Sequence, residues 1–401
     1  MTARLQSEGK ILAWMCVLIG VNQLGFGAVI PVLPLYAQSF GVSQTAIGFT
    51  VAIYGLARLF VALPSGRIAD LFGRRNALAL GGLICCAGNL WCAYASTFTE
   101  LAMARFVSGA GAGLTLTAGM IVLTDITTPA RRGRVMAIYQ GVFLFAVGIG
   151  PIPGGYLAEE FGLSAPFLVY AVGCFIAAVV AWWAVAETKP DTPPLHQQTS
   201  RPQSYTSQLR AVLRAKGFLL AGAVSFVGTV VRTGALFSIV PLIGTMQLNL
   251  TATQIGIAMG VGSVLGVMVS YPAGVLVDLI GRKSVIVPAT IASGFSFVLY
   301  GLAPDYTWFI LACAFWGVAS SASGSAPAAY AADVAPPEYS ATAMSVYRTL
   351  ADSGYVLGPI LLGAIADAFG MTTALMVASS MLIAVALLFA FRAPESYRPR
   401  D

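Results

Sequence analysis

Five charged side chains lie inside long apolar stretches of this sequence, where a charge is energetically costly. They are four arginines and one aspartate: Arg58, Arg105, Arg232, Arg348 and Asp352. A charge at the middle of a bilayer costs roughly 2.5–3.5 kcal/mol on insertion scales, so each of these residues needs a reason to be there. Arginine recognises carboxylates and other oxyanions, and a carboxyl group can carry a proton. The set therefore predicts anion binding and proton transfer within a membrane.

Helices that cross a bilayer are needed to hold these residues. Of the 401 residues, 58% are hydrophobic and 9% are charged, whereas soluble domains carry roughly 25% charge. A helix of about 20 apolar residues crosses the hydrocarbon core. Twelve such stretches are predicted, at 11–36, 44–66, 76–96, 100–124, 134–157, 164–186, 217–244, 252–277, 284–303, 306–332, 341–364 and 371–391. We therefore expect an all-α membrane protein with twelve transmembrane helices.

One segment of the chain recurs 208 residues later without an insertion. Residues 64–75 are repeated as residues 272–283, each at a short charged turn between two apolar stretches. The same offset relates further pairs: Asp125 and Asp333, Tyr139 and Tyr347, Gly150-Pro151 and Gly358-Pro359, Gly155 and Gly363. Two copies of an apolar unit are typical of alternating-access transporters. The sequence predicts a six-helix bundle in residues 1–186, a polar cytoplasmic linker in 187–216 and a second six-helix bundle in 217–401.

The basic residues predict the orientation of the chain. With the N-terminus inside, 18 of the 22 Lys and Arg residues fall at cytoplasmic positions and none falls in an outer loop. We expect a multi-pass protein of the cytoplasmic membrane with both termini in the cytoplasm. The net charge of +6 then reflects topology and calls for no nucleic-acid partner.

Residues that would support an enzyme or a cofactor are not arranged for it. The six cysteines lie in apolar stretches without metal-ligand spacing, and the single histidine, His196, lies in the polar linker. No phosphate-binding Gly-x-x-x-x-Gly-Lys-Ser/Thr run occurs. We expect neither a cofactor nor enzymatic activity, although a membrane-embedded enzyme or a sensor stays as a minor alternative.

The repeated turn suggests a gating latch. Gly66 and Gly274 are expected to let helix backbones approach closely, and Gly73 and Gly281 to form a turn with positive φ. Asp70 lies four residues before Arg74, so the two side chains can pair or reach neighbouring helix ends. The alternative is a basic loop that only fixes topology.

The turn Gly66-x-x-Ala69-Asp70-x-x-Gly73-Arg74-Arg75-x-x-Leu78 resembles the loop 2–3 signature of the major facilitator superfamily. The resemblance implies two six-helix bundles, related by pseudo-twofold symmetry about the membrane normal, around one central cavity. It implies that the loop locks the outward-facing state and that Asp70 and Arg74 form a charge cluster with Asp125. The symmetric set is Asp278, Arg282 and Asp333.

Three further motifs resemble the branch of twelve-helix drug:proton antiporters. They are Leu24-Gly25-x5-Pro31-Val32-Leu33-Pro34, Leu101-x3-Arg105-x2-Ser108-Gly109-x-Gly111-Ala112, and Gly150-Pro151-Ile152-Pro153-Gly154-Gly155. The resemblance implies that Arg105 assists proton exchange; the alternative is that it snorkels to the outer interface. Ser108 replaces the usual glutamine, and Ala137 and Ala146 replace glycines of the third motif.

The third motif has a physical meaning of its own. Pro151 removes a backbone donor, so Gly150-Pro151 is expected to break or bend the helix. Gly154 and Gly155 would give a smooth face against a neighbouring helix. Such a helix can seal a leak path or act as a hinge, or it can simply pack closely.

Asp352 is the only acid that we place well inside a span. It lies four residues after Arg348, on the same helix face, and roughly 15 Å deep at 1.5 Å per residue, near the depth of Arg58. In the superfamily fold the two helices concerned face each other. We hypothesise that Asp352 pairs with Arg348, Arg58 or both, and that protonation of Asp352 loosens the contact between the two halves of the protein. The alternative is a permanently ionised structural pair.

The embedded charges also predict the substrate. Four arginines against one acid leave the interior net positive, and the first helix offers only Asn22 and Gln23 as polar groups. A neutral amphipath or an organic anion is therefore expected, with Arg232 and Arg105 as anion partners. Aromatic side chains are candidates to line the cavity: Trp14, Tyr54, Tyr139, Phe143 and Tyr347.

Taken together, the sequence predicts a monomeric secondary transporter in the lipid bilayer that exports a small molecule in exchange for protons by alternating access. A facilitator or proton symporter for an anionic metabolite on the same fold is the alternative.

Overall fold

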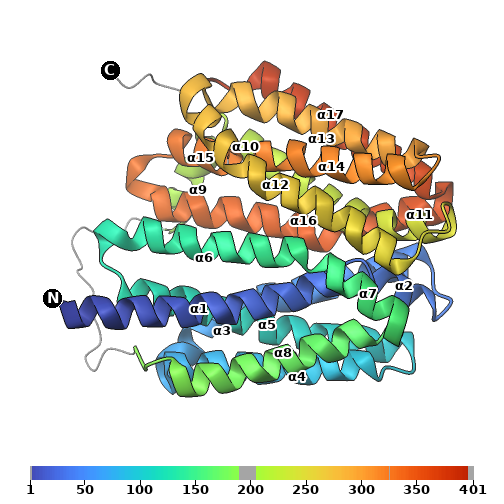
Figure 1. The fold of residues 1–401 in the computed structure, drawn as a ribbon. Helices are drawn as coiled ribbons and strands as arrows, with labels where there is room; N and C mark the ends of the chain where they lie inside the picture. Colours follow the sequence, from blue (N-terminus) through green and yellow to red (C-terminus); the bar gives the residue numbers. More distant parts are fainter. Residues whose placement is uncertain (1, 189–204, 325, 396–401) are drawn as a thin grey trace. The chain divides into compact units, whose positions relative to one another are not determined.

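A computed structural model describes residues 2–188, 205–324 and 326–395, in which every regular element is helical (Figure 1). The first eight helices are α1 (Thr2–Val29), α2 (Leu33–Gln38), α3 (Gln44–Phe72), α4 (Arg74–Ala93), α5 (Phe98–Ile126), α6 (Pro129–Ile149), α7 (Pro151–Phe161) and α8 (Ala165–Ala184). The rest are α9 (Tyr205–Arg214), α10 (Phe218–Val231), the π-helix η1 (Arg232–Ile239), α11 (Val240–Met246), α12 (Ala252–Ile280), α13 (Arg282–Leu302), α14 (Tyr306–Ser323), α15 (Ala326–Val334), the 3₁₀ turn η2 (Pro337–Tyr339), α16 (Ser340–Phe369) and α17 (Met371–Arg392).

Within the described residues, twelve helices are long and apolar enough to cross a membrane, and some of them are built from two or three of these elements. They are Glu8–Val29, Gln44–Ala62, Arg74–Ala93, Phe98–Ile126, Arg134–Phe161, Ala165–Ala184, Phe218–Met246, Ala252–Val277, Arg282–Leu302, Tyr306–Val334, Thr342–Phe369 and Met371–Arg392. Each overlaps one predicted stretch, so the all-α membrane fold predicted from the sequence is confirmed.

Proline explains two places where the observed helices differ from one unbroken span. The first predicted stretch ends early, because α1 stops at Val29 and α2 begins only at Leu33, around Pro31 and Pro34, which lack a backbone donor. The fifth span is divided at Gly150 into α6 and α7, as the Gly150-Pro151 pair predicts. The equivalent Pro359 lies inside the continuous helix α16.

The chain forms two compact units. Unit 1 comprises Met1–Val42, Phe49–Pro194 and Thr251–Gly260, and unit 2 comprises Ser43–Gly48, Leu195–Leu250 and Val261–Asp401. Each unit also contains a short segment from the other half of the sequence. Ser43–Gly48, at the beginning of α3, belongs to unit 2, and Thr251–Gly260, at the beginning of α12, belongs to unit 1.

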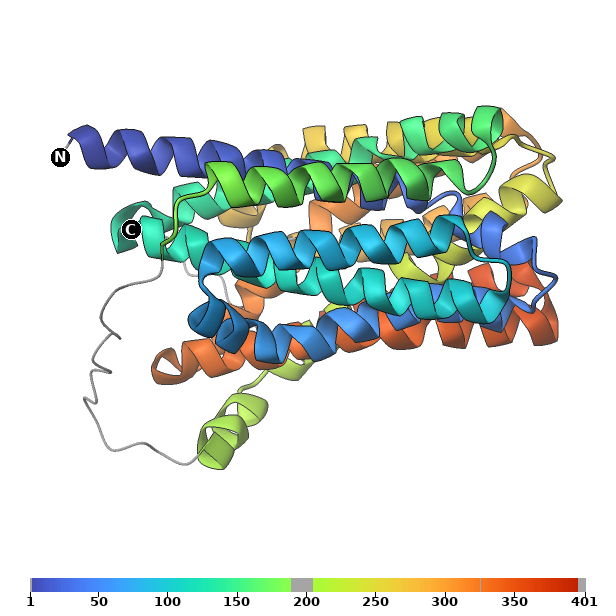
Figure 2. The ribbon, with the colours of Figure 1, turned by 90° about the horizontal axis from the view of Figure 1, so that it is seen from below.

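The helices of the two units pack in the same pattern. In unit 1, α4 packs against α5 and α8, while α1 packs against α6 and α8 (Figure 2). In unit 2, α13 packs against α14 and α17, while α10 packs against α16 and α17. These pairs correspond at the 208-residue offset, so the sequence repeat encodes repeated packing.

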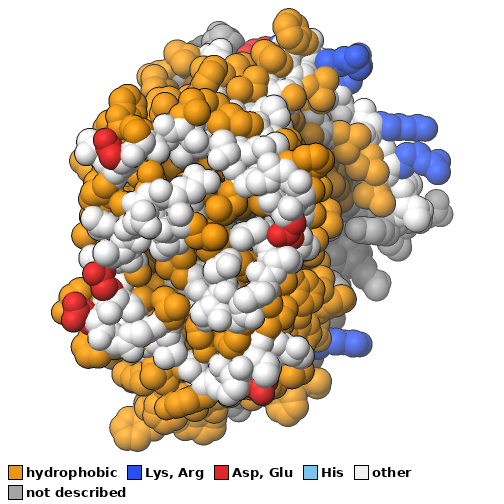
Figure 3. All heavy atoms as spheres, turned by 90° about the vertical axis from the view of Figure 1, so that its right-hand side faces the viewer, with side chains coloured by type: hydrophobic (Ala, Val, Ile, Leu, Met, Phe, Trp, Pro, Cys, Tyr) orange, Lys and Arg blue, Asp and Glu red, His pale blue; other side chains and the backbone are white. Residues whose placement is uncertain are grey.

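Apolar side chains fill the interior of each unit and also cover its outside. One buried cluster includes Met15, Leu123 and Tyr139, and the other includes Phe218, Tyr330 and Phe389. Large apolar side chains are exposed as well; Trp183 and Phe391 are both 85% exposed. Lipid is the solvent that so many exposed apolar side chains require. Figure 3 looks onto the helix ends at the right of Figure 1, where isolated acidic side chains lie among hydrophobic and uncharged ones.

Helix ends are fixed by local signals that also repeat. The Thr97 hydroxyl caps α5 by accepting from Glu100 N, and the Glu100 carboxylate accepts from the N–H of Ser96, the residue before the cap. Asp305, 208 residues after Thr97, caps α14 by accepting from Trp308 N. Gly73 and Gly281 start α4 and α13 with φ of 91° and 96°, as their positions in the repeated turn predict.

Candidate functional site: a polar cavity, a buried arginine and two charge clusters

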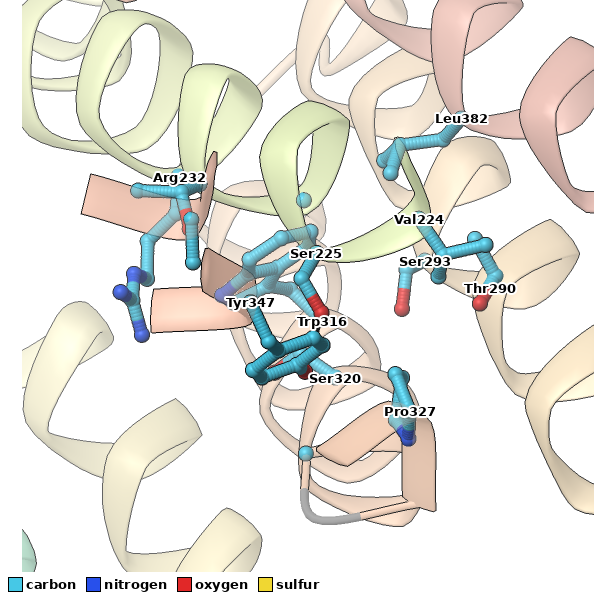
Figure 4. A pocket seen from close by; sticks show the side chains of 14 residues that line it. Val224, Ser225, Arg232, Thr290, Ser293, Trp316, Ser320, Pro327, Tyr347 and Leu382 are labelled. Atoms are coloured by element: carbon cyan, nitrogen blue, oxygen red, sulfur yellow. Dashed lines mark hydrogen bonds between the residues drawn. The ribbon is translucent and has the colours of Figure 1, made fainter. Parts of the chain in front are cut away.

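Unit 2 contains a cavity of about 240 Å³ with a cationic and hydroxyl-rich lining (Figure 4). The lining residues come from α10, η1, α13, α14, α15, α16 and α17 and from the connection at Gly324. They include Ser225, Thr229, Arg232, Thr290, Ser293, Trp316, Ser320 and Tyr347. None of the described lining residues is acidic. The cavity is therefore suited to a ligand that is neutral or negatively charged.

The hydroxyl groups of the cavity differ in how they are bonded. The Ser225 and Tyr347 hydroxyls hydrogen-bond to each other and so link α10 to α16. Ser293 donates to the Ala289 carbonyl at 2.8 Å. Thr290 is 3% exposed, and its Oγ1 has no hydrogen-bond partner in the described structure. A buried hydroxyl without a partner is costly unless a ligand or water completes it.

Arg232 lies where the backbone of the seventh span changes from α-helix to π-helix. The segment Arg232–Ile239 has i→i+5 bonding, a rare geometry that is often found at functional sites. Thr233 donates to the Thr229 carbonyl at 2.9 Å, and Ser238 donates to the Thr233 carbonyl at 3.0 Å. The first bond has the four-residue spacing of an α-helix and the second the five-residue spacing of the π-helix, and both tie side chains to the backbone beside Arg232.

Unit 1 contains a buried guanidinium. Arg105 is 1% exposed, and its Cζ lies 4.2 Å from the centre of the Tyr54 ring, which in turn stacks on Phe26. Nε donates to the Thr50 carbonyl at 3.5 Å, while Nη1 has no hydrogen-bond partner among the described residues. Asn22 and Gln23 are also buried, and Asn22 Oδ1 is likewise unpartnered. Arg105 is thus enclosed by protein, which argues against snorkelling.

The first charge cluster brings together the predicted residues of the repeated turn. Arg74 contacts the Asp70 carboxylate at 2.8 Å and the Asp125 carboxylate at 3.0 Å, and it donates to the Ala69 carbonyl at 3.1 Å. Glu187, at the end of the sixth span, accepts from the backbone N–H groups of Arg74 and Arg75 at 2.8 and 3.3 Å. A carboxylate at a helix N-terminus is favoured by the helix dipole.

The second charge cluster repeats this arrangement in unit 2. Arg282 contacts the Asp333 carboxylate at 3.0 Å and donates to the Val277 carbonyl at 3.1 Å. Lys283 donates to the Ala393 carbonyl at 2.8 Å, at the end of the twelfth span. The side chain of Asp278 lies outside the described residues.

The predicted packing glycines divide into two groups. A Cβ at Gly150, Gly154 or Gly155 would collide with the backbone of a neighbouring segment, so the close approach predicted for this motif is present. At Gly66 and Gly274 no described atom lies within 4 Å of a Cβ position. The close helix contact predicted for these two glycines is therefore wrong for this structure, because both face open space.

The remaining predicted residues are placed differently from one another. Arg348 Nε lies 3.8 Å from Asp352 Oδ2, and both side chains are exposed, so this predicted pair is present but not enclosed by protein. Arg232 is exposed and Arg58 is partly buried. All five embedded charges lie within membrane-length helices, and of these five side chains only Arg105 is enclosed by protein. Tyr139 belongs to an apolar core cluster, where it packs rather than lines a described cavity.

Several groups at the sites were missed by the sequence reasoning. Thr290, Ser293 and Trp316 line the cavity, and Glu187 caps α4. A signal existed for another part of the cavity lining, because Ser225 and Thr229 lie four residues apart on one helix face and Arg232 follows three residues later. Small polar residues in apolar helices are common, however, and spacing alone does not say which of them face a cavity.

Two carboxylates accept hydrogen bonds from backbone N–H groups at the beginnings of α12 and α3. Glu159, near the end of α7, accepts from Thr253 N at 3.1 Å within unit 1. Asp367, near the end of α16, accepts from Gln44 N at 2.7 Å and Thr45 N at 2.9 Å, and from the Thr45 hydroxyl, within unit 2. The 208-residue offset relates Glu159 to Asp367. It also relates Thr45 to Thr253.

Twelve membrane-length helices, a repeated packing pattern and repeated charged turns define a two-bundle membrane transporter. The Major Facilitator Superfamily profile matches residues 15–269 and 226–401, and the chain belongs to this family. It is a family of transporters, and the assignment excludes the enzyme alternative.

Individual relatives and solved structures agree with the family. An uncharacterised MFS-type transporter of Methanocaldococcus jannaschii is 22% identical over 350 residues, covering 87% of this chain and 89% of the relative. Multidrug resistance protein 1 of Bacillus subtilis is 26% identical over 243 residues, 61% of this chain and 60% of the relative. The crystal structure of a D-xylose–proton symporter aligns with a TM-score of 0.74 at 15% identity, over 96% of this chain and 98% of that one. That of the human organic anion transporter MFSD10 aligns with a TM-score of 0.67 at 15% identity, over 95% and 99%.

Proposed function

We propose that this transporter exports a small organic anion or neutral amphipath in exchange for protons. The observation that carries the proposal is the lining of the unit 2 cavity, which combines Arg232 with hydroxyl groups and contains no described acid. A cationic substrate would be repelled by the positive charge of Arg232, whereas an anion gains a charge-assisted hydrogen bond.

The names of the relatives support export, and the name of one structural neighbour supports an anionic substrate. Several are named multidrug resistance proteins, and one solved neighbour of the same fold is named an organic anion transporter. In the proposal, the chain lies in the cytoplasmic membrane with both termini inside and works as a monomer. The bundles expose the substrate to one side of the membrane at a time, and the two charge clusters act as latches on the inner side.

Proton coupling is assigned to Asp352 and Arg105. Asp352 is a carboxyl group within a membrane span, close to Arg348, and protonation would weaken that pair. Arg105 is enclosed beside Tyr54, and its Nη1 has no described partner. In the proposal this group donates a hydrogen bond to water or substrate during the step in which protons cross the membrane.

Flux measurements in proteoliposomes test the proposal. Benzenesulfonate and phenyltrimethylammonium are similar in size, permanently charged and opposite in sign, so a pH gradient does not move them by changing their ionisation. We expect an inward proton gradient to accelerate the exit of preloaded benzenesulfonate but not of phenyltrimethylammonium. Preference for the cation would refute the anionic substrate class. Uptake of benzenesulfonate along with protons would instead identify the symporter alternative.

A further inference from the structure

We propose that the unit 2 cavity selects a planar, single-ring carboxylic acid that also carries a hydroxyl group. This inference rests on the proposed function and names the substrate class more narrowly. It follows from the different chemistry at the two ends of the cavity, which Figure 4 shows with Arg232 on one side of Ser225 and Tyr347, and Thr290 and Ser293 on the other.

The end formed by α13 is built for a group that both donates and accepts. Ser293 already donates to the Ala289 carbonyl, so its oxygen offers lone pairs to a ligand. Thr290 Oγ1 is buried and without a partner in the described structure, so its hydroxyl proton is available. Figure 4 shows both oxygens directed into the cavity. A ligand hydroxyl can donate to Ser293 and accept from Thr290, and an ether or an alkyl group cannot do both.

The middle of the cavity favours a flat ring. Trp316 forms part of the wall and is held by an edge-on contact with Phe297, with ring centroids 4.8 Å apart. Tyr347, tied to Ser225, supplies a second aromatic side chain. The volume of about 240 Å³ lies below the ~300–1,000 Å³ of pockets for drug-sized ligands, which limits the occupant to about one ring.

Arg232 supplies the opposite end. A guanidinium presents two parallel N–H groups to a carboxylate, and this fork favours a planar oxyanion over a neutral group. A ring with a carboxylate at one position and a hydroxyl across from it would place both polar groups at the two polar ends while its faces contact Trp316 and Tyr347.

Calorimetric binding to the purified full-length protein tests the inference with 4-hydroxybenzoate, benzoate and cyclohexanecarboxylate. We expect 4-hydroxybenzoate to bind at least ~10-fold more tightly than benzoate, because benzoate leaves the Thr290 hydroxyl unpaired. Cyclohexanecarboxylate should bind more weakly than benzoate because it is not flat. Thr290→Val should abolish the preference for the hydroxyl, so that 4-hydroxybenzoate and benzoate bind about equally.

Controls separate this inference from the proposed function and from loss of folding. Thr245→Val, which removes a hydroxyl that lies outside the cavity and bonds to backbone carbonyls, should leave all three affinities unchanged. Thr290→Val should not lower the melting temperature, since it removes an unpartnered buried hydroxyl. Equal binding of benzoate and 4-hydroxybenzoate, or an unchanged preference in Thr290→Val, would overturn the inference but not anion export. Absence of organic anion transport in the flux assay would overturn both.

Discussion

Arg105 shows how a single buried charge reveals selection for function. Desolvating an ion costs several kcal/mol even after relaxation. The stacking of Arg105 on Tyr54 returns only about 2 kcal/mol, the usual value for a desolvated cation–π contact, and Nη1 has no described partner. The side chain therefore costs stability at its position, which is explained if transport requires it.

Replacing Arg105 with methionine tests this view. Arg105→Met keeps most of the volume and removes the buried charge, so we expect an unchanged or higher melting temperature in detergent together with a loss of transport of more than ~10-fold. Arg105→Lys retains the charge without the planar stacking group and should recover only part of the activity. A methionine variant that transports like the wild type would show that the guanidinium has no transport role.

Asp352 offers the complementary test, because its ion pair is weak. The pair with Arg348 spans 3.8 Å and both side chains are exposed, so Asp352→Asn should change the free energy of unfolding by less than about 1 kcal/mol. We expect the same variant to exchange substrate between equal concentrations normally but to lose acceleration by a pH gradient. Retention of pH-driven flux would remove Asp352 from the coupling mechanism.

At the scale of helices, glycine decides how closely α7 and α1 pack. A Cβ at Gly154 would collide with the backbone of Ala28, whereas a Cβ at Gly141 on the same span meets nothing within 4 Å. The two positions therefore form a matched pair within one span.

We expect opposite stability effects from this pair of substitutions. Gly154→Ala should destabilise the protein by about 1–3 kcal/mol through overpacking. Gly141→Ala should be neutral or stabilise it by up to about 1 kcal/mol through helix propensity. Thermal unfolding in detergent measures both. Similar melting temperatures for the two variants would show that α1 and α7 can move apart at Gly154 with little loss of stability.

At the scale of the whole molecule, the 208-residue repeat relates contacts as well as residues. Glu159 binds Thr253, and Asp367 binds Gln44 and Thr45, at equivalent positions of the two copies. A neutral amide accepts weaker hydrogen bonds from backbone N–H groups than a carboxylate does.

If the repeat governs these contacts, Glu159→Gln and Asp367→Asn should both lower the melting temperature, and the double variant should lower it further. The neighbouring Glu160→Gln is the control, since Glu160 is exposed and only the charge changes. An effect of the control as large as that of Glu159→Gln would attribute the change to net charge rather than to the cap.

The sequence by itself determined the membrane class, the twelve spans, the repeat and the residues of the two charge clusters. Those features depend on local composition, on turn chemistry at Gly73 and Gly281, and on spacing along one helix, and each of these can be recognised within a short stretch of sequence. The resemblance to the major facilitator superfamily added the partnership of Arg74 with Asp125, which are far apart in the chain.

Only the tertiary structure decided which polar groups share a cavity and which glycines touch a neighbour. Thr290 and Arg232 lie on different helices, so their common cavity depends on how α13 and η1 pack, and no short-range pattern contains this information. Gly66 and Gly154 both belong to recognised motifs, yet only Gly154 has a backbone against it. The burial of Arg105 and the exposure of Arg232 and Asp352 were settled in the same way, because burial is a property of the surrounding helices and not of the residue.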